Sequence, residues 1–131
     1  MLKIEAIHHI AILTSNELYE VSKQFYTDVL GFTVIAEVFR KERNSYKLDL
    51  ALNGEYQVEL FSFPDHRDRG SFPESKGLRH LAFAVKDIKA GYEWLIGKNV
   101  KVEAIRTDAF TGKDFLFFYD PNDQPLELYQ L

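Results

Sequence analysis

The sequence contains no cysteine, one methionine, one tryptophan and only four prolines. Without cysteine there is no disulfide, no thiolate nucleophile and no cysteine-ligated zinc site. This composition fits a reducing compartment, and we expect a cytoplasmic protein. No apolar run approaches the roughly 20 residues that a membrane-spanning helix needs. No apolar stretch follows the early charge at Lys3 either, so we expect no signal peptide.

A strong excess of charge of one sign is also missing. The chain has 16 Lys and Arg against 20 Asp and Glu, for a net charge of −4. Nucleic-acid-binding domains are usually basic, so we expect neither a nucleic-acid partner nor a membrane partner. What is present is 131 residues with 46% hydrophobic and 15% aromatic side chains. Such a chain is expected to form one domain rich in β structure.

The chain repeats itself. The segments around His9 and His80 share the pattern His-apolar-Ala-apolar, which is typical of a strand. A stretch of helical periodicity follows each segment and is expected to end at Gly31 or Gly97. Asp87 is the expected cap of the second helix.

In the first helix we expect Ser15 or Asn16 as the cap. Leu18, Val21 and two further apolar residues then recur at helical spacing, and we expect them to face the core. An extended run follows each helix, at 32–39 in the first half and at 100–105 in the second.

Each half closes on two strands joined by a turn. The first turn is Asn53–Gly54, a strong hairpin signal, and the second covers 120–123. We therefore predict an α+β fold built from paired βαβββ modules, at 1–63 and 77–131. The polar segment 64–76 links them within a single domain covering 1–131.

Strand alternation places particular polar residues on one face of each module. His9 and Glu59 share a face in the first module, and His80 and Glu127 share the matching face in the second. The separations are similar, since 59 − 9 = 50 and 127 − 80 = 47. A lone strand histidine is usually structural, but here both residue types recur at the same two places. We therefore predict that His9, Glu59, His80 and Glu127 bind one divalent metal ion.

The same alternation indicates a partly aromatic cup with polar groups at its base, as in small-molecule pockets. Arg106 stands just before a loop that could border the cup. The candidates for contacting a small-molecule substrate are Lys47, Asp49, Gln57, Phe61, Phe117 and Arg106. A plain surface role is the alternative for the charged and amide residues among them. We expect His8 to face away from His9, and the run 40–43 to form a solvated turn.

Four motifs together resemble the vicinal oxygen chelate (VOC) superfamily, in particular its glyoxalase I group. They are Ile7–Ile12, Phe25–Phe32, Gly77–Phe83 and Asp120–Leu128. Two further stretches, 49–54 and 59–64, are similar to the short bacterial YaeR-like branch. The resemblance implies paired βαβββ modules that form a curved mixed sheet around a metal cup, with one ligand from each of four equivalent strands. It also implies a homodimer.

Two imidazoles and two carboxylates suit Ni, Co, Zn, Mn or Fe and do not select among them. The resemblance implies a glyoxalase-type lyase or isomerase, of the lactoylglutathione lyase type, acting on a small substrate with adjacent oxygens by metal-assisted proton transfer. Glu127 is the first candidate for the catalytic base and Glu59 the second.

The sequence departs from the glutathione-using members at two positions. Leu13 and Phe63 stand where those members carry Arg and Asn, and neither side chain can bind a peptide carboxylate. Two other functions stay open. One is a non-haem iron dioxygenase, and the other is a non-catalytic module that binds a small molecule.

Overall fold

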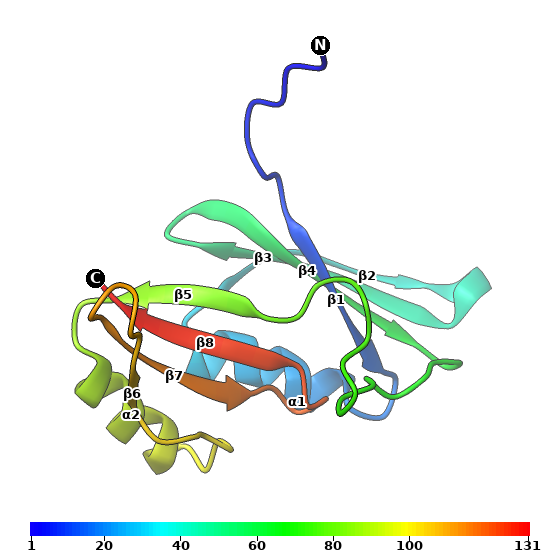
Figure 1. Cartoon of the computed structure of the whole chain (residues 1–131). Coiled ribbons are helices and arrows are strands. Elements are labelled where there is room, and N and C mark those ends of the chain that lie inside the picture. Colours follow the sequence, from blue (N-terminus) through cyan, green and yellow to red (C-terminus); the bar gives the residue numbers. More distant parts are fainter. The chain divides into compact units, whose positions relative to one another are not determined.

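Two four-stranded sheets organise the chain, one in each half (Figure 1). The computed structural model describes residues 1–131, all of the chain, which divides into the units Met1–Arg67 and Asp68–Leu131. Each unit has its own sheet and its own α-helix, and each is described by itself.

The first unit begins with a parallel strand pair and continues as an antiparallel sheet. Its sheet order is β1-β4-β3-β2, in which β1 runs parallel to β4. Its elements are β1 (Ile10–Ser15), α1 (Tyr19–Gln24), the π-helical turn η1 (Phe25–Val29), β2 (Thr33–Arg40), the 3-10 turn η2 (Lys41–Arg43), β3 (Ser45–Leu52) and β4 (Glu55–Phe63).

The second unit repeats this topology with the order β5-β8-β7-β6, and β5 runs parallel to β8. Its elements are β5 (Leu81–Val85), α2 (Ile88–Gly97), β6 (Arg106–Thr107), β7 (Asp114–Tyr119) and β8 (Pro125–Gln130). Both sheets are mixed, so the predicted α+β class and the paired βαβββ modules are confirmed.

The extended run expected at 100–105 is not a regular strand. It contributes the isolated bridge between Val102 and Phe118, and β6 follows it as a strand of two residues. The Tyr119 N–H donates to the Lys101 carbonyl at 3.1 Å, and the Glu103 N–H donates to the Phe117 carbonyl at 2.8 Å. The run therefore lies along β7 without forming a continuous ladder.

Side-chain alternation decides which face of each sheet is buried. The buried apolar residues of the sheets include Ile12, Leu48, Leu50, Val58 and Leu60 in the first unit, and Leu116, Phe118, Leu126 and Leu128 in the second. These side chains alternate with the predicted site residues, so the buried face of each sheet is the one opposite the predicted polar face. The opposite faces carry the candidate site residues.

The buried side of α1 is rotated from the predicted one. Tyr19 is buried, whereas Leu18 and Val21 are 37% and 45% exposed. The Tyr19 ring packs 4.1 Å from the Tyr46 ring, and its hydroxyl donates to Glu37. An aromatic side chain can be buried in this way because its polar tip has a partner.

The second helix begins and packs as its sequence predicts. The Asp87 side chain caps α2 by accepting a hydrogen bond from the Ala90 N–H at 3.0 Å. A Cβ at Gly91 would lie 2.8 Å from the Leu128 Cδ1, so a larger residue there would require the Leu128 side chain of β8 to shift. The left-handed residue after the helix is Asn99 (φ 58°) rather than Gly97. The structure has no helix with the length and apolar character to cross a membrane.

The turn between β3 and β4 is the predicted two-residue hairpin. Asn53 and Gly54 both have positive φ, 53° and 81°, and the flanking residues Leu52 and Glu55 pair directly. These backbone angles match a type I′ turn, which follows the twist of the strands.

Glu37 joins the edge strand β2 to α1. The Tyr19 hydroxyl donates to its carboxylate, and the Lys23 Nζ lies 2.9 Å from its Oε2. The hydrogen bond from Tyr19 and then that from Lys23 lower the pKa of Glu37, outweighing its partial burial. A carboxyl group whose pKa is lowered by folding stabilises the fold at pH values above its ordinary pKa. This stability is lost as the pH falls through the lowered pKa of the folded protein.

We expect Glu37→Gln to lower the free energy of unfolding at pH 7 by about 1–2 kcal/mol, because it removes the charge that these donors stabilise. Urea denaturation at pH 7 and at a pH below the lowered pKa of Glu37 measures the effect, which should shrink at the lower pH, where the carboxyl is protonated. Glu42→Gln, in the exposed η2 turn, is the control. An equal loss at both pH values would contradict the assignment.

Candidate functional site

Parallel pairing of the first and last strands creates one His–Glu pair in each unit. Ala11, two positions after His9, pairs with Glu59 between β1 and β4. Ala82, two positions after His80, pairs with Glu127 between β5 and β8. The His9 Nε2 is 4.0 Å from the Glu59 Oε2, and the His80 Nε2 is 2.8 Å from the Glu127 Oε2. The two units therefore present the same residue types at the same register.

The donor chemistry of these pairs fits a divalent metal ion. Each pair offers an imidazole nitrogen and a carboxylate, the donors that suit first-row divalent ions. Glu127 is buried, and the Glu59 side chain is only 12% exposed. The structure contains no group of three or more His, Cys, Asp or Glu side chains arranged to hold a metal. Each unit by itself thus supplies two of the four predicted ligands.

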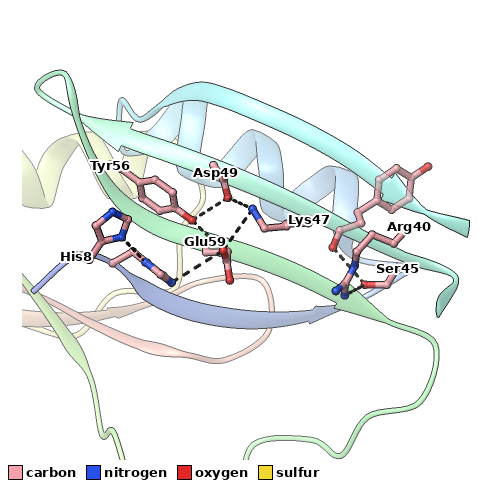
Figure 2. A network of polar contacts seen from close by, with 9 residues as sticks. His8, Arg40, Ser45, Lys47, Asp49, Tyr56 and Glu59 are labelled. Atoms are coloured by element: carbon pink, nitrogen blue, oxygen red, sulfur yellow. Dashed lines mark hydrogen bonds and ion pairs between the residues drawn. The ribbon is translucent and has the colours of Figure 1, made fainter. Parts of the chain in front are cut away.

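Glu59 belongs to a polar network on the open face of the first sheet (Figure 2). The Tyr56 hydroxyl lies 2.9 Å from the Glu59 Oε2 and 2.8 Å from the Asp49 Oδ1. The Lys47 Nζ lies 2.7 Å from the same Asp49 oxygen and 3.4 Å from the Glu59 Oε2. Two carboxylates therefore share one ammonium and one phenol.

The network changes the pKa of its members in opposite directions. The hydrogen bond with Asp49 raises the pKa of Lys47, against its desolvation. Burial alone would raise the pKa of Asp49, but the bonds from Lys47 and Tyr56 outweigh it and lower this pKa. Burial, then the two carboxylates, raise the pKa of Tyr56, which keeps its proton at neutral pH.

Alternation along β4 failed to identify Tyr56. It stands three residues before Glu59, so regular alternation would turn it to the opposite face. The ladder shifts register between Leu50 and Ala51, which pair with Val58 and Tyr56 respectively. Gln57 is left out of the ladder pairing at this irregularity, and the Tyr56 hydroxyl lies on the same side as Glu59. Gln57, a predicted substrate contact, is partly buried, and no hydrogen bond joins it to the network.

The expectation that His8 faces away from His9 is wrong. The Nδ1 atoms of the two rings are 2.7 Å apart, and the His8 and His9 rings lie 5.3 and 5.0 Å from the Tyr56 ring. β1 starts only at Ile10, so both histidines precede the strand, and His8, two residues before it, departs from strand alternation.

Around the His–Glu pair, the open face of the second sheet is aromatic, whereas that of the first is polar. Phe117 lies opposite Glu127 in the ladder, and its ring centroid is 5.0 Å from that of His80. The Arg106 guanidinium lies 5.6 Å above the Phe117 ring, as does that of Arg79, which the sequence prediction did not include. Both predicted contacts, Phe117 and Arg106, are therefore neighbours on this face.

Arg40 is not the solvated turn residue that its sequence context suggested. It is the last residue of β2 and is partly buried. Its guanidinium lies 4.7 Å above the ring of Phe61, a predicted substrate contact, and 5.6 Å above that of Phe63. The aromatic end of the first sheet thus carries a cation that turn composition alone could not reveal.

Comparisons with known proteins agree on the fold. The Glyoxalase/Bleomycin resistance protein/Dioxygenase superfamily matches residues 6–128. The uncharacterized protein YaeR of Escherichia coli (strain K12) is 55% identical over 130 residues, which cover 99% of both chains. A glyoxalase family protein from Enterococcus faecalis has a TM-score of 0.88 at 44% identity, covering 95% of this chain and 97% of that chain. The fosfomycin resistance protein FosX from Listeria monocytogenes, complexed with Mn(II), shares the fold at a TM-score of 0.75 and 15% identity, over 97% of this chain and 93% of its own.

We expect Tyr56→Phe to lower the free energy of unfolding by about 1–2 kcal/mol, because Asp49 and Glu59 then lose a shared donor. Urea denaturation at neutral pH measures the change. Tyr92→Phe, which removes a hydroxyl from the partly buried side of α2, is the matched control. Equal stability of Tyr56→Phe and the unaltered protein would show that the phenol does not support the network.

Proposed function

The chain belongs to the Glyoxalase/Bleomycin resistance protein/Dioxygenase superfamily, and from this membership we propose that it is a metal-dependent lyase or isomerase of the glyoxalase type. Its substrate would be a small compound with adjacent oxygens. The observation that carries the proposal is the His–Glu pair found at the same register in both units.

The ligands in this proposal are His9, Glu59, His80 and Glu127. A divalent ion held by these residues would supply Lewis acidity to a substrate oxygen. The donor set suits Ni, Co, Zn, Mn and Fe alike. FosX, which shares the fold, is seen with Mn(II), and that supports a metal in the superfamily rather than a particular metal here.

Glu127 is the better candidate for the base that moves the substrate proton. Glu59 already lies within hydrogen-bond distance of Tyr56 and within 3.4 Å of Lys47, so its lone pairs are partly engaged. Glu127 lies opposite Phe117, and its only polar side-chain contact is with His80 at 2.8 Å. Glu127 would accept the proton at a carboxylate oxygen and return it, while Tyr56 and Lys47 would hold Glu59 in place.

The substrate would enter against the aromatic face of the second sheet. Phe115 and Phe117 offer an apolar surface, with the Arg106 guanidinium above both rings and the Arg79 guanidinium above Phe117. Leu13 and Phe63 occupy the positions at which glutathione-using relatives carry polar side chains, and Leu13 is 46% exposed. These residues favour a substrate other than a glutathione adduct.

We also propose that the protein acts as a homodimer. Leu2, Ile4 and Ile7 are 81%, 76% and 78% exposed in the stretch before β1, which pairs with no strand of its own chain. Exposed apolar surface of this kind is typical of sites that another protein covers. The resemblance to short members that pair their modules between subunits points the same way.

The metal is tested by elemental analysis and native mass spectrometry of protein purified without an affinity tag. We expect about one divalent ion per chain and the mass of a dimer. His9→Ala and His80→Ala should each lower the metal content, whereas His66→Ala, an exposed histidine of the linking segment, should retain it.

No uptake of metal after dialysis against Ni, Co, Zn, Mn and Fe would overturn this proposal and leave a non-catalytic binding module. Bound iron together with oxygen uptake on catechol-like substrates would indicate the dioxygenase instead. A monomeric mass would refute the proposed homodimer but would leave the proposed metal site unaffected.

We expect Glu127→Gln to retain most of its metal and to lose turnover by about 10²–10⁴-fold, the range for loss of a general base. The assay follows the isomerisation of 2-oxoaldehyde adducts of small thiols, with metal content measured on the same samples. Glu93→Gln, on the exposed side of α2, is the control. Unchanged turnover would exclude Glu127 as the base and direct attention to Glu59.

A further inference from the structure

Three arginines lie over phenylalanine rings, and one of them has no acidic partner. Arg79 pairs with Glu74 at 3.5 Å, and Arg106 pairs with Glu103 at 3.7 Å. Arg40 makes no ion pair in the structure. Its one hydrogen bond within the chain runs from Nη2 to the Ser45 hydroxyl, at 2.7 Å.

The guanidinium of Arg40 is also partly withdrawn from water. Its Nε is buried and meets no acceptor. Ser45, which holds Nη2, is fully buried, and the rings of Phe61 and Phe63 lie beneath the group. A cation in such a place lacks both full hydration and a counter-ion, which is unfavourable unless something else supplies the negative charge.

Arg40 lies on the same face of the sheet as the His–Glu pair of its unit. Phe61 and Phe63 follow Glu59 in steps of two along β4, so their rings share its face. At about 3.3 Å per residue, the rings begin roughly 7 and 13 Å from Glu59 along the strand. Figure 2 shows Arg40 and Ser45 at one end of this face, His8 at the other and Lys47 between them.

Lys47, the other cation of this face, is already neutralised. Its ammonium lies 2.7 Å from Asp49 and 3.4 Å from Glu59. An incoming anion would have to compete with both carboxylates there. Arg40 presents no such competition, and its planar fork suits the two oxygens of a carboxylate or phosphate.

We propose that Arg40 is the anion-recognition residue of the ligand site, and that the natural ligand carries a carboxylate or phosphate group that binds it. That this ligand is also the substrate rests on the proposed function. The anionic end would meet the edge of the guanidinium, beside the Phe61 and Phe63 rings, while the opposite end extends toward Glu59. Ser45 orients the guanidinium for this contact.

The test uses the full chain stripped of metal, so that neither metal binding nor turnover enters the measurement. Inorganic phosphate and malonate are titrated separately at constant ionic strength, with chloride as the balancing salt. Binding is followed by calorimetry and by the ¹H–¹⁵N signal of the Arg40 Nε, whose burial should slow its exchange with water. The absence of that signal from Arg40→Gln assigns it.

We expect Arg40→Gln to weaken anion binding about tenfold to a hundredfold, the value of a hydrogen bond to a charged group. Arg40→Lys should weaken it less, because the charge remains while the fork is lost. Arg43→Gln, an exposed arginine of the adjacent turn, should bind as the unaltered protein does. Tighter binding of phosphate assigns a phosphorylated ligand, and tighter binding of malonate a carboxylate ligand.

Failure of the unaltered protein to bind either anion overturns the proposal, as does equal binding by Arg40→Gln. Thermal unfolding shows whether Arg40→Gln is folded. If it is not folded, Arg40→Lys and Ser45→Ala test the proposal instead. Both should weaken anion binding, because one removes the planar guanidinium and the other its orienting hydrogen bond. Unchanged binding in both variants would overturn the proposal. A protein that binds anions through Arg40 yet takes up no metal would refute the proposed function alone.

Discussion

The parallel pairing of the first and last strands in each unit is the constraint on which the candidate site depends. It sets each histidine beside its glutamate, and the apolar neighbours of each glutamate hold the register. Val58 and Leu60 flank Glu59, Leu126 and Leu128 flank Glu127, and all four apolar side chains are buried. A slip of one residue would bury the carboxylate and expose these side chains, at a cost that the sheet could not offset.

The two units share this register but surround the pair differently. Glu59 lies among Lys47, Asp49 and Tyr56, whose contacts hold its carboxylate in place. Glu127 lies opposite Phe117 and contacts only His80 among polar side chains. A duplicated framework therefore carries two distinct environments, one suited to holding a carboxylate still and one suited to an apolar part of a ligand. The division of roles proposed for the two glutamates follows from this difference.

The sequence prediction was wrong where local geometry departs from regular strands. Tyr56 reaches the face of Glu59 because the β3–β4 ladder shifts register, and nothing in the alternation of side chains indicates where a ladder will do so. His8 lies two residues before β1, where the alternation of the strand no longer holds. Arg40 stands at the junction of β2 and a turn, and only the packing of Phe61 beneath it distinguishes it from a solvated charge.

The sequence by itself determined the repeat, the α+β class, the Asn53–Gly54 hairpin and the inward and outward faces of the regular strands. Each follows from a short-range rule, either a period of two along a strand or the backbone preference of a turn. Only the tertiary structure decided how Tyr56 and Lys47 hold Glu59, and that Arg40 lies over a pair of rings without a counter-ion. Lys47 and Arg40 reach their partners from other strands, whereas Tyr56 lies on the same strand as Glu59 and reaches it only because the ladder shifts register. No local pattern encodes that shift or the side-chain packing.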